Sequence, residues 1–531
     1  MTTKTTQCVI LATSDVHGHI YPTNYRDESI RPLGLAKLAT VIKQERLKKI
    51  PTVYLDNGDL IQGSPMMYYY YKTAQKQHPM IEVMNHLGLD AWVIGNHEFN
   101  FGKAALKDAI SQANFPVLSA NISDKHDTLG HKPYTIKTLD QGIRIAILGV
   151  TTSFVPYWEA PNHIEDLDFH DAFTSTKNWV KIIRSVEQVD AVIVSYHGGF
   201  ERDLATGALT ERDTGENVGY RILHEIDGID CLITGHQHQT IYYKDGKKVA
   251  IQPGVNGDVL GKVTLTFTYD SDHWKLSDVT PTLIPITDKT VPDAHVLAMT
   301  ETLHLQTEDY LDQPIGHTTI DLRVSDPFQL RLGNHPLIDF INHVQRTVSG
   351  ADLSLTSLFN NEAPGFYETI TRRDILATYV YPNTLTVLEL TGEDIRQALE
   401  HTATYFTWTD DVLAVDPSFL KPKPAHYNYD MWDGIDYTLD ITKPVGKRVG
   451  HLYYQGQPLD LTKSISVVMN HYRASGGGGY TMFQDKPVLK EIQRDMTELI
   501  AEYIESHPEF HVTPRGHFNV MKNAPLALTH K

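Results

Sequence analysis

Acidic, amide and histidine side chains follow five apolar, strand-like runs in the first half of the chain. The runs end in the motifs ATSDVHG, LDNGD, VIGNHE, VSYHGG and ITGHQH. Each motif alone is weak evidence, because a polar residue after a strand often does no more than form a turn. Together they favour one shared site, since ligands bind beyond the carboxyl ends of strands in α/β sheets. The side chains offered there are Asp15, His17, Asp59, Asn96, His97, His197, His236 and His238.

Carboxylate, imidazole and amide groups in this combination suit divalent metal ions. Carboxylates and imidazoles bind Zn, Mn and Fe, and the lack of cysteine in the motifs argues against a structural zinc site. Two such cations about 3.5–4 Å apart can share a carboxylate and a water, and can activate that water for attack on phosphorus. We therefore predict two divalent metal ions (Mn, Zn or Fe) as cofactors.

The runs that carry these residues alternate with helical patterns. GLAKLATVIKQERLKK and STKNWVKIIRSVEQ have helical spacing, and they stand among strand-like runs such as TVYLDNGD, IRIAILGVT and AVIVSYHG. Alternation of this kind predicts βαβ units in an α/β fold. KVTLTFTYD, which follows, has the pattern of an antiparallel strand, so we expect a mixed sheet.

The length of 531 residues exceeds what one compact core usually holds, so we expect two domains. A Pro- and Thr-rich stretch, SDVTPTLIPITDKTVPD, and a helical one, AHVLAMTETLHLQTEDYL, mark the break. Strand and helix patterns then restart, and they end in a long helical stretch around LKEIQRDMTELIAEYIESH. We predict a catalytic domain over residues 1–290, a linker with a connecting helix over 291–330 and a second domain over 331–531.

The composition argues against several classes of partner and of protein. A net charge of −18 argues against long nucleic acid, whose partners are usually basic. Cys8 and Cys231 lie in apolar runs, so we expect buried thiols and no disulfide framework. No apolar run approaches the ~20 residues of a membrane span, and the N-terminus lacks a signal-peptide pattern. We expect no membrane span, a monomer or a dimer, and a cytoplasmic location, or export if a leader preceded this chain.

The order D-x-H, G-D, G-N-H-E, H and G-H-x-H resembles that of the calcineurin-like metallophosphoesterases over residues 8–262. The resemblance implies a four-layer α/β/β/α domain that hydrolyses phosphoesters. His97 would stay off the metals, beside the scissile phosphate, and Glu98 would hold the loop. The positions that match metal ligands of that family are Asp15, His17 and His238 for one metal, Asn96, His197 and His236 for the other, and Asp59 as the bridge.

Residues 331–525 resemble the C-terminal domain of the 5′-nucleotidase family, which implies a smaller α/β domain that binds a nucleotide. Tyr429 precedes an Asp-Gly turn, and Tyr480 follows four glycines. By the resemblance, these two tyrosines would clamp a base, and such stacking contributes about 1–3 kcal/mol per base. From the residues alone, two core aromatics beside a flexible loop remain an alternative interpretation.

Several segments are similar to one branch of that family, the 2′,3′-cyclic-nucleotide 2′-phosphodiesterase/3′-nucleotidases. These segments are DNGDLIQGSP, YVYPNTLTVLELTG, YNYDMWDGIDY and NHYRASGGG. The 5′-nucleotidases usually have an aspartate three residues after the catalytic histidine, where this chain has Asn100, so His97 would lack a charged partner. The resemblance therefore implies a small-molecule nucleotide substrate that is opened from its 2′,3′-cyclic form and then loses its 3′-phosphate.

Other classes of function remain open. One is an enzyme with a different substrate: a 5′-nucleotidase, a hydrolase of nucleotide sugars such as UDP-sugars, or a relative of the thiosulfohydrolases. Another is a nucleotide-binding module without catalysis, which the competent residues at all expected metal and catalytic positions argue against.

Overall fold

The computed structural model describes residues 4–521, except for residues 28, 74–75, 160, 211–212, 271, 382, 411, 421–423, 493, 511 and 513–515. Contacts within the chain divide it into two compact units, Met1–Glu308 and Asp309–Lys531. The division falls inside helix α8 (Ala294–Asp312), which lies in the segment that we predicted to be a linker with a connecting helix.

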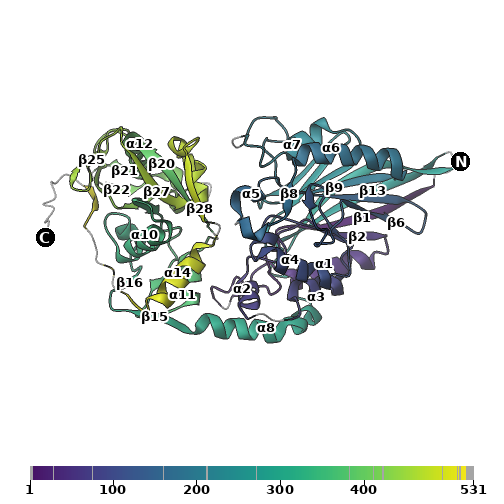
Figure 1. Cartoon of the computed structure of the whole chain (residues 1–531), viewed down its shortest axis with the longest axis horizontal. Coiled ribbons are helices and arrows are strands. Elements are labelled where there is room, and N and C mark those ends of the chain that lie inside the picture. The colour runs from purple at the N-terminus through teal and green to yellow at the C-terminus, as the bar shows by residue number, and fades with distance from the viewer. Residues whose placement is uncertain are drawn as a thin grey trace. The chain divides into compact units, whose positions relative to one another are not determined.

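Two six-stranded sheets form the centre of the first unit (Figure 1). The strands β14-β13-β1-β2-β3-β4 of one sheet are His273–Pro285, Val259–Asp270, Thr5–Thr13, Thr52–Asp56, Ala91–Val93 and Val117–Leu118. The strands β11-β12-β10-β9-β7-β6 of the other are Thr240–Asp245, Lys248–Pro253, Cys231–Thr234, Ala191–His197, Arg144–Thr151 and Tyr134–Thr138. Because β13 pairs antiparallel with β1 while β1 to β4 run parallel, the predicted mixed sheet is confirmed.

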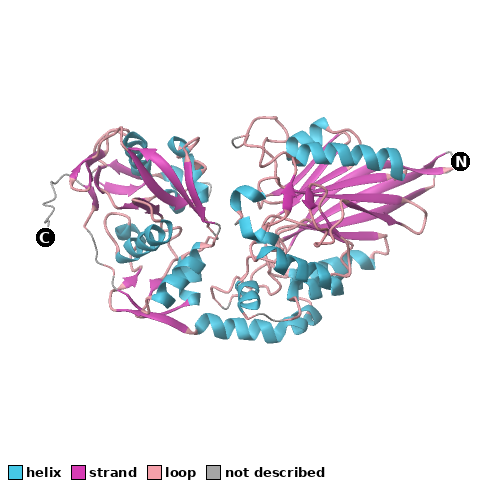
Figure 2. Ribbon diagram, viewed as in Figure 1, coloured by secondary structure: helices cyan, strands magenta, loops and turns pink. Residues whose placement is uncertain are grey.

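The sheets pack face to face, and helices cover both outer faces (Figure 2). Successive side chains of a strand point to opposite faces, so in β9 Ile193 joins the core between the sheets while Val192 and Val194 pack under helices. This arrangement confirms the predicted four-layer α/β/β/α domain. The covering helices are α1 (Leu35–Leu47), α3 (Pro79–Leu87) and α4 (Gly102–Gln112) on one side and α6 (Ala172–Ile182) and α7 (Gly219–Glu225) on the other.

Shorter elements complete the first unit. They include α2 (Pro65–Lys72), α5 (Val155–Trp158), the 3₁₀ turns His97–Phe99 and Pro161–His163, and the paired strands β5 (Ile122–Asp124) and β8 (Leu167–Phe169). The turn at His97–Phe99 follows β3 closely, so its polar residues lie just beyond the carboxyl end of that strand.

The second unit is a smaller α/β domain around a five-stranded mixed sheet. Its strands β23-β17-β27-β20-β28 are Met431–Asp433, Leu353–Thr356, Ser464–Asn470, Leu385–Thr391 and Val488–Ile492. Thr371 and Thr391 each begin a helix with a capping box. The helices are α9 (Pro327–Leu330), α10 (Pro336–Ser349), α11 (Arg372–Thr378), α12 (Gly392–Thr402), α13 (His471–Ala474) and α14 (Met496–Ser506).

The predicted helical stretch LKEIQRDMTELIAEYIESH is helical only in its second part. LKEI belongs to the strand β28, which pairs with β20, and helix α14 begins only at Met496. Asp495 caps that helix by accepting a hydrogen bond from the backbone of Thr497, which gives the helix a defined start. Sheet pairing thus overrides the local helical pattern before the cap.

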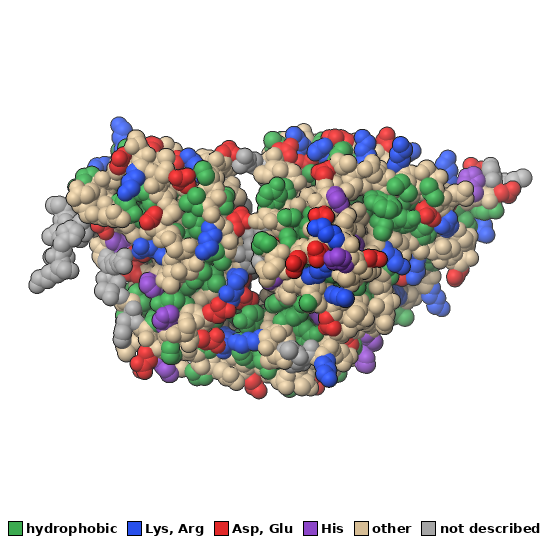
Figure 3. Space-filling model, in the orientation of Figure 1, with side chains coloured by type: hydrophobic (Ala, Val, Ile, Leu, Met, Phe, Trp, Pro, Cys, Tyr) green, Lys and Arg blue, Asp and Glu red, His purple; other side chains and the backbone are tan. Residues whose placement is uncertain are grey.

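Cys8 and Cys231 are buried free thiols, as predicted. Burial raises the pKa of Cys8 to about 12, so its thiol is inert. In the part of the chain that the structure describes, no helix is both long and apolar enough to cross a bilayer. On the face seen in Figure 3, Lys and Arg side chains are interspersed with Asp and Glu, and the described residues of that face show no continuous basic stripe.

Candidate metal centre

The predicted ligands occupy turns with unusual backbone geometry. Positive φ angles between 49° and 68° occur at Asp15, His17, Asp59, His236 and His238. A residue other than glycine in this region is uncommon, and such backbone costs about 1–3 kcal/mol. Strained backbone of this kind persists only where the surrounding structure enforces it. Because it occurs at five of the predicted ligands, we infer that the turns serve to hold those side chains in a particular direction.

Asp15, His17 and His238 form one group, in which the ligand atoms lie within 4.8 Å of one another. The Nε2 atoms of His17 and His238 are 2.9 Å apart, and His238 Nε2 is 3.5 Å from Asp15 Oδ1. His17 Nδ1 donates to the carbonyl oxygen of Gln62 at 3.0 Å, which leaves its Nε2 as a lone-pair donor. Two imidazole nitrogens and a carboxylate oxygen therefore point at one position, as the ligands of a cation do.

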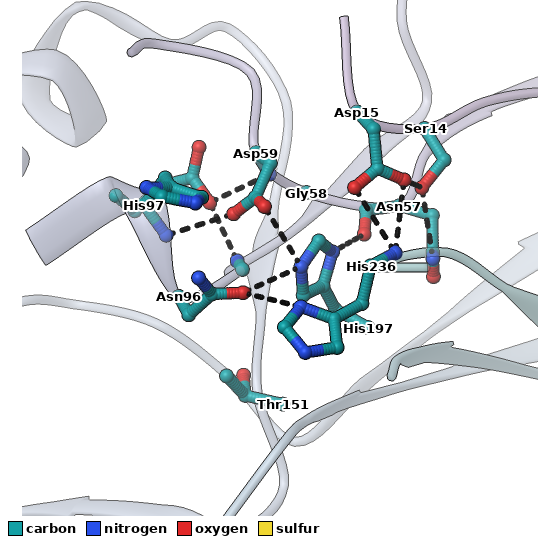
Figure 4. A network of polar contacts seen from close by, with 12 residues as sticks. Ser14, Asp15, Asn57, Gly58, Asp59, Asn96, His97, Thr151, His197 and His236 are labelled. Carbon is teal, nitrogen blue, oxygen red and sulfur yellow. Dashed lines mark hydrogen bonds and ion pairs between the residues drawn. The ribbon is translucent and has the colours of Figure 1, made fainter. Parts of the chain in front are cut away.

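Asp59, His197 and His236 form a second group within the same 4.8 Å limit. Asn96 Oδ1 joins them, at 3.0 Å from His197 Nε2 and 2.9 Å from His236 Nδ1 (Figure 4). His197 Nδ1 donates to the carbonyl oxygen of Asn57 at 2.7 Å, so its Nε2 faces Asp59 Oδ2, 3.1 Å away. Among the described residues, these two groups are the clusters of three or more such donors that lie close enough to hold a metal ion.

Glu216, which sequence reasoning missed, orients the ring of His236. Its Oε1 lies 2.9 Å from His236 Nε2, so the Nδ1 of that ring is the nitrogen turned toward Asn96. Carboxylates that hold the far nitrogen of a metal-binding histidine are common in metalloproteins. The residue stands in a loop without a strand-end motif, so no signal in the sequence singled it out.

Burial and neighbouring charges set the electrostatics of the site. Burial opposes the charge on His197, but Asp59 outweighs it and raises the pKa of His197 to about 10. Burial likewise opposes the charge on Asp59, yet His197 and His97 hold the pKa of Asp59 well below its usual range. Burial and the neighbouring His238 lower the pKa of His17. A cation that binds here competes with the proton of His197, because metal binding needs the neutral imidazole.

Glu98 holds together the two turns that carry Asp59 and Asn96, in line with the predicted loop-holding role. Its carboxylate is fully buried. Oε2 accepts hydrogen bonds from the backbone of Asp59 at 2.8 Å and Gly95 at 2.6 Å, and Oε1 accepts from Leu60 at 2.6 Å and Ile61 at 3.3 Å. Burial, helped by the charge of Asp59, raises the pKa of Glu98 to about 7.

His97 lies beside both groups, and its ring contacts a side chain outside the metal-ligand set. Its backbone N–H donates to Asp59 Oδ1 at 2.8 Å, and its Nδ1 lies 2.6 Å from Asn100 Oδ1. Asn100 Nδ2 donates in turn to Glu159 Oε2 at 2.8 Å. The expectation that His97 lacks a charged partner therefore needs refinement, because a carboxylate lies one side chain further out. Glu159 follows helix α5 in a segment without a recognisable motif, so no sequence pattern indicated this contact.

The prediction that Tyr429 and Tyr480 clamp a base needs correction. Both rings are fully buried in the hydrophobic core of the second unit. The guanidinium of Arg473 lies 4.0 Å from the centroid of the Tyr480 ring, and the ring of Phe483 stacks with it. The Tyr429 hydroxyl donates to the carbonyl oxygen of Arg331 at 2.7 Å. Neither ring leaves a face open to a base, and the alternative interpretation of core aromatics fits.

Two other tyrosines in the same motifs have accessible rings. Tyr472 is 40% exposed, and Tyr427 is half-buried. Their ring centroids are 6.3 Å apart with an interplanar angle of 71°. Tyr427 stands two residues before Tyr429, and Tyr472 stands eight before Tyr480, so each motif contains one buried tyrosine and one whose ring is accessible.

Comparison with known proteins matches a family model to each unit. Residues 8–240 match the calcineurin-like phosphoesterases, and residues 314–485 match the 5′-nucleotidase C-terminal domain.

Similar full-length proteins have related names. A 2′,3′-cyclic-nucleotide 2′-phosphodiesterase/3′-nucleotidase of Yersinia enterocolitica is 28% identical over 98% of this chain and 89% of its own length. The trifunctional nucleotide phosphoesterase protein YfkN of Bacillus subtilis is 27% identical over 93% of this chain, which spans 37% of that longer protein. A Staphylococcus aureus structure, provisionally named a 5′-nucleotidase and solved with alpha-ketoglutarate, is 35% identical with a TM-score of 0.77, and the match covers 97% of this chain and 100% of that one.

Proposed function

The chain belongs to the calcineurin-like phosphoesterases that carry a 5′-nucleotidase C-terminal domain, and on that premise we propose that it hydrolyses 2′,3′-cyclic nucleotides to 3′-nucleotides and then removes the 3′-phosphate. The observation that carries this choice is Asn100 in contact with His97, where the 5′-nucleotidases that the motifs resemble have an aspartate. The full-length Yersinia enterocolitica relative with that name supports it.

The ligand groups fit two divalent cations, Mn, Zn or Fe, because their donors are nitrogen and oxygen atoms without thiolate. Asp15, His17 and His238 would hold one cation, and Asn96, His197 and His236 the other, with Asp59 offered to both. When bound, such a pair supplies a water that is nucleophilic at neutral pH and positive charge for the phosphate oxygens.

His97 is proposed as the residue that exchanges a proton with the phosphate or the leaving oxygen. Its backbone bond to Asp59 Oδ1, at 2.8 Å, fixes it next to the bridging carboxylate. General acid–base catalysis by a positioned histidine contributes about 10²–10⁴-fold to a rate. Loss of that contribution is the expected effect of His97→Ala.

The second unit is proposed to bind the base, through Tyr427 and Tyr472 rather than through the buried pair Tyr429 and Tyr480. An exposed aromatic face stacks on any base, because every base has a π-face. We therefore expect a broad preference among bases. A small anionic nucleotide also suits a chain whose charge argues against long nucleic acid.

A second candidate is hydrolysis of 5′-nucleotides or of nucleotide sugars such as UDP-sugars. It is favoured by the Staphylococcus aureus protein provisionally named a 5′-nucleotidase, which is 35% identical over 97% of this chain. A nucleotide-binding module without catalysis is the remaining candidate, and the complete donor sets oppose it.

A panel of four substrates separates these candidates. Purified protein is assayed with 2′,3′-cyclic AMP, 3′-AMP, 5′-AMP and UDP-glucose, once with Mn²⁺ and once with Zn²⁺. We expect turnover of the first two to dominate and Asp59→Ala to abolish it. Dominant turnover of 5′-AMP or UDP-glucose would overturn the substrate assignment, and tight binding without turnover would support the non-catalytic module.

A further inference from the structure

We propose that Glu159 is a positioning residue that acts through Asn100 to fix the orientation and the tautomer of His97. The inference rests on the proposed function in one respect, namely that His97 takes part in phosphoester hydrolysis. It does not depend on which nucleotide is cleaved. His97, Asn100, Glu159 and His163 form one chain of polar contacts, and it joins the turn after β3 to the loop after α5.

The rules of hydrogen bonding decide which way Asn100 points. A carboxylate accepts hydrogen bonds and does not donate them, so Asn100 has to turn its Nδ2 toward Glu159 Oε2, 2.8 Å away. Its Oδ1 then faces His97 Nδ1 at 2.6 Å. Because this carbonyl oxygen also only accepts, Nδ1 of His97 has to carry a proton.

This tautomer determines which nitrogen of His97 does chemistry. With Nδ1 engaged as a donor, Nε2 on the opposite edge of the ring is the nitrogen that can exchange a proton with substrate. If Asn100 were free to flip, its amide group would face Nδ1 and select the other neutral tautomer. The wrong histidine tautomer lowers kcat by about 10⁴-fold in serine-protease triads, so this choice has a large potential effect.

Glu159 is itself held firmly enough to impose an orientation. It is a buried residue, with 8% of its surface exposed, and its Oε1 lies 2.8 Å from His163 Nδ1. Its backbone N–H donates to the carbonyl oxygen of Val155 at 2.9 Å. Both carboxylate oxygens are therefore engaged, one by His163 and one by Asn100. Asn100 thus orients the His97 ring as an aspartate at that position would, but the negative charge lies on Glu159, one side chain further from His97.

A double-mutant cycle at positions 100 and 159 tests this inference. Asn100→Asp alone sets two carboxylates against each other across a 2.8 Å contact, so we expect kcat for 3′-AMP to fall about tenfold or more. Glu159→Gln alone permits either orientation of Asn100, and we expect a fall of about two- to fivefold. In the double variant the new carboxylate accepts from His97 Nδ1 and the new amide donates to that carboxylate. We therefore expect kcat within about threefold of the unsubstituted enzyme.

A second substrate distinguishes positioning from general damage. The leaving group of p-nitrophenyl phosphate departs without a proton, so we expect all variants to cleave it at rates within about threefold of one another. KM for 3′-AMP should change little, since the substitutions leave binding intact. Glu165→Gln, the same chemical change at an exposed position of the same loop, is the matched control and should behave as the unsubstituted enzyme.

Metal content and melting temperature are measured for every variant, so that loss of metal or of fold is recognised. The cycle is run on whichever nucleotide of the panel is turned over, which keeps it interpretable if the substrate assignment fails. A double variant slower than both single variants would overturn the inference. Equal losses on the nucleotide and on p-nitrophenyl phosphate would also overturn it, because they indicate a structural role.

Discussion

Replacing Glu98 with glutamine tests whether this buried carboxylate builds the metal centre. Its oxygens accept hydrogen bonds from the backbone N–H groups of Asp59, Gly95, Leu60 and Ile61. A glutamine presents one oxygen and one NH₂ group in the same space. Whichever way it turns, two of the backbone donors face another donor and lose their acceptor.

The loss can be estimated from these contacts. Hydrogen bonds to a charged group contribute about 1.5–3 kcal/mol, and a buried donor left unsatisfied costs about 1–3 kcal/mol. The bond from Ile61, at 3.3 Å, is long and contributes least, so the favoured orientation gives up this bond and that of Leu60. We expect Glu98→Gln to lower the free energy of unfolding by about 3–5 kcal/mol. For a unit of this size, that corresponds to a melting temperature lower by about 5–8 °C.

Differential scanning calorimetry of the metal-free protein at pH 8 measures this change, and titration with Mn²⁺ or Zn²⁺ measures the affinity of the loaded site. Because Glu98 fixes the turns that carry Asp59 and Asn96, we expect metal affinity to fall about 10- to 100-fold. Glu301→Gln on the exposed face of α8 is the control and should melt as the unsubstituted protein does. A Glu98→Gln variant that melts within about 2 °C of that protein and binds metal equally well would refute the reasoning.

Three further substitutions and the removal of metal also have expected outcomes. In Gly95→Ala the new Cβ would lie 2.4 Å from Asp59 Oδ1, so the variant should retain less metal than the parent after dialysis, as measured by elemental analysis. Tyr472→Ala should raise KM for a nucleotide about 5- to 150-fold while its kcat changes little, in keeping with the loss of about 1–3 kcal/mol of stacking; an unchanged KM would argue against the base site. Asp430→Asn leaves Arg473 as an unpaired buried cation and should lower stability in urea by about 3–5 kcal/mol, whereas a loss below about 1 kcal/mol would contradict this. Chelation with EDTA should abolish turnover, and Mn²⁺ or Zn²⁺ should restore it.

The grouping of the candidate metal ligands was the most predictable part of this chain, for a physical reason. The ligand types and their place after apolar runs are local features, and parallel strands bring such ends to the same edge of each of the two sheets, which pack face to face. The alternation of strand and helix patterns predicted the α/β layers in the same way. Local patterns therefore sufficed for Asp15, Asp59 and His197, because a strand end positions each of them.

The contacts that escaped prediction depend on long-range packing. Glu159 reaches Asn100 across 59 residues of chain, and Glu216 reaches His236 from a loop without regular structure. Neither has a local sequence pattern that distinguishes it from the other acidic residues of the chain. The prediction that Tyr429 and Tyr480 have rings open to a base failed for a related reason. Whether a ring at position 427 or 429 faces the core is decided by what packs there, and Asn428 between them gives no indication.

The left-handed turns that carry the predicted metal ligands limit how this site can be rebuilt in another protein. A designer who grafts only the side-chain types onto common type I turns would place Asp15 or His238 in the wrong direction, since both central residues of such turns have negative φ, whereas these two residues have φ angles of 52° and 55°. Glycine is the relaxed residue for such backbone, but it carries no ligand. The chain has kept the ligand at a cost to its own stability, so a successful transplant has to copy the rigid sheet ends that enforce the turns together with the residues themselves.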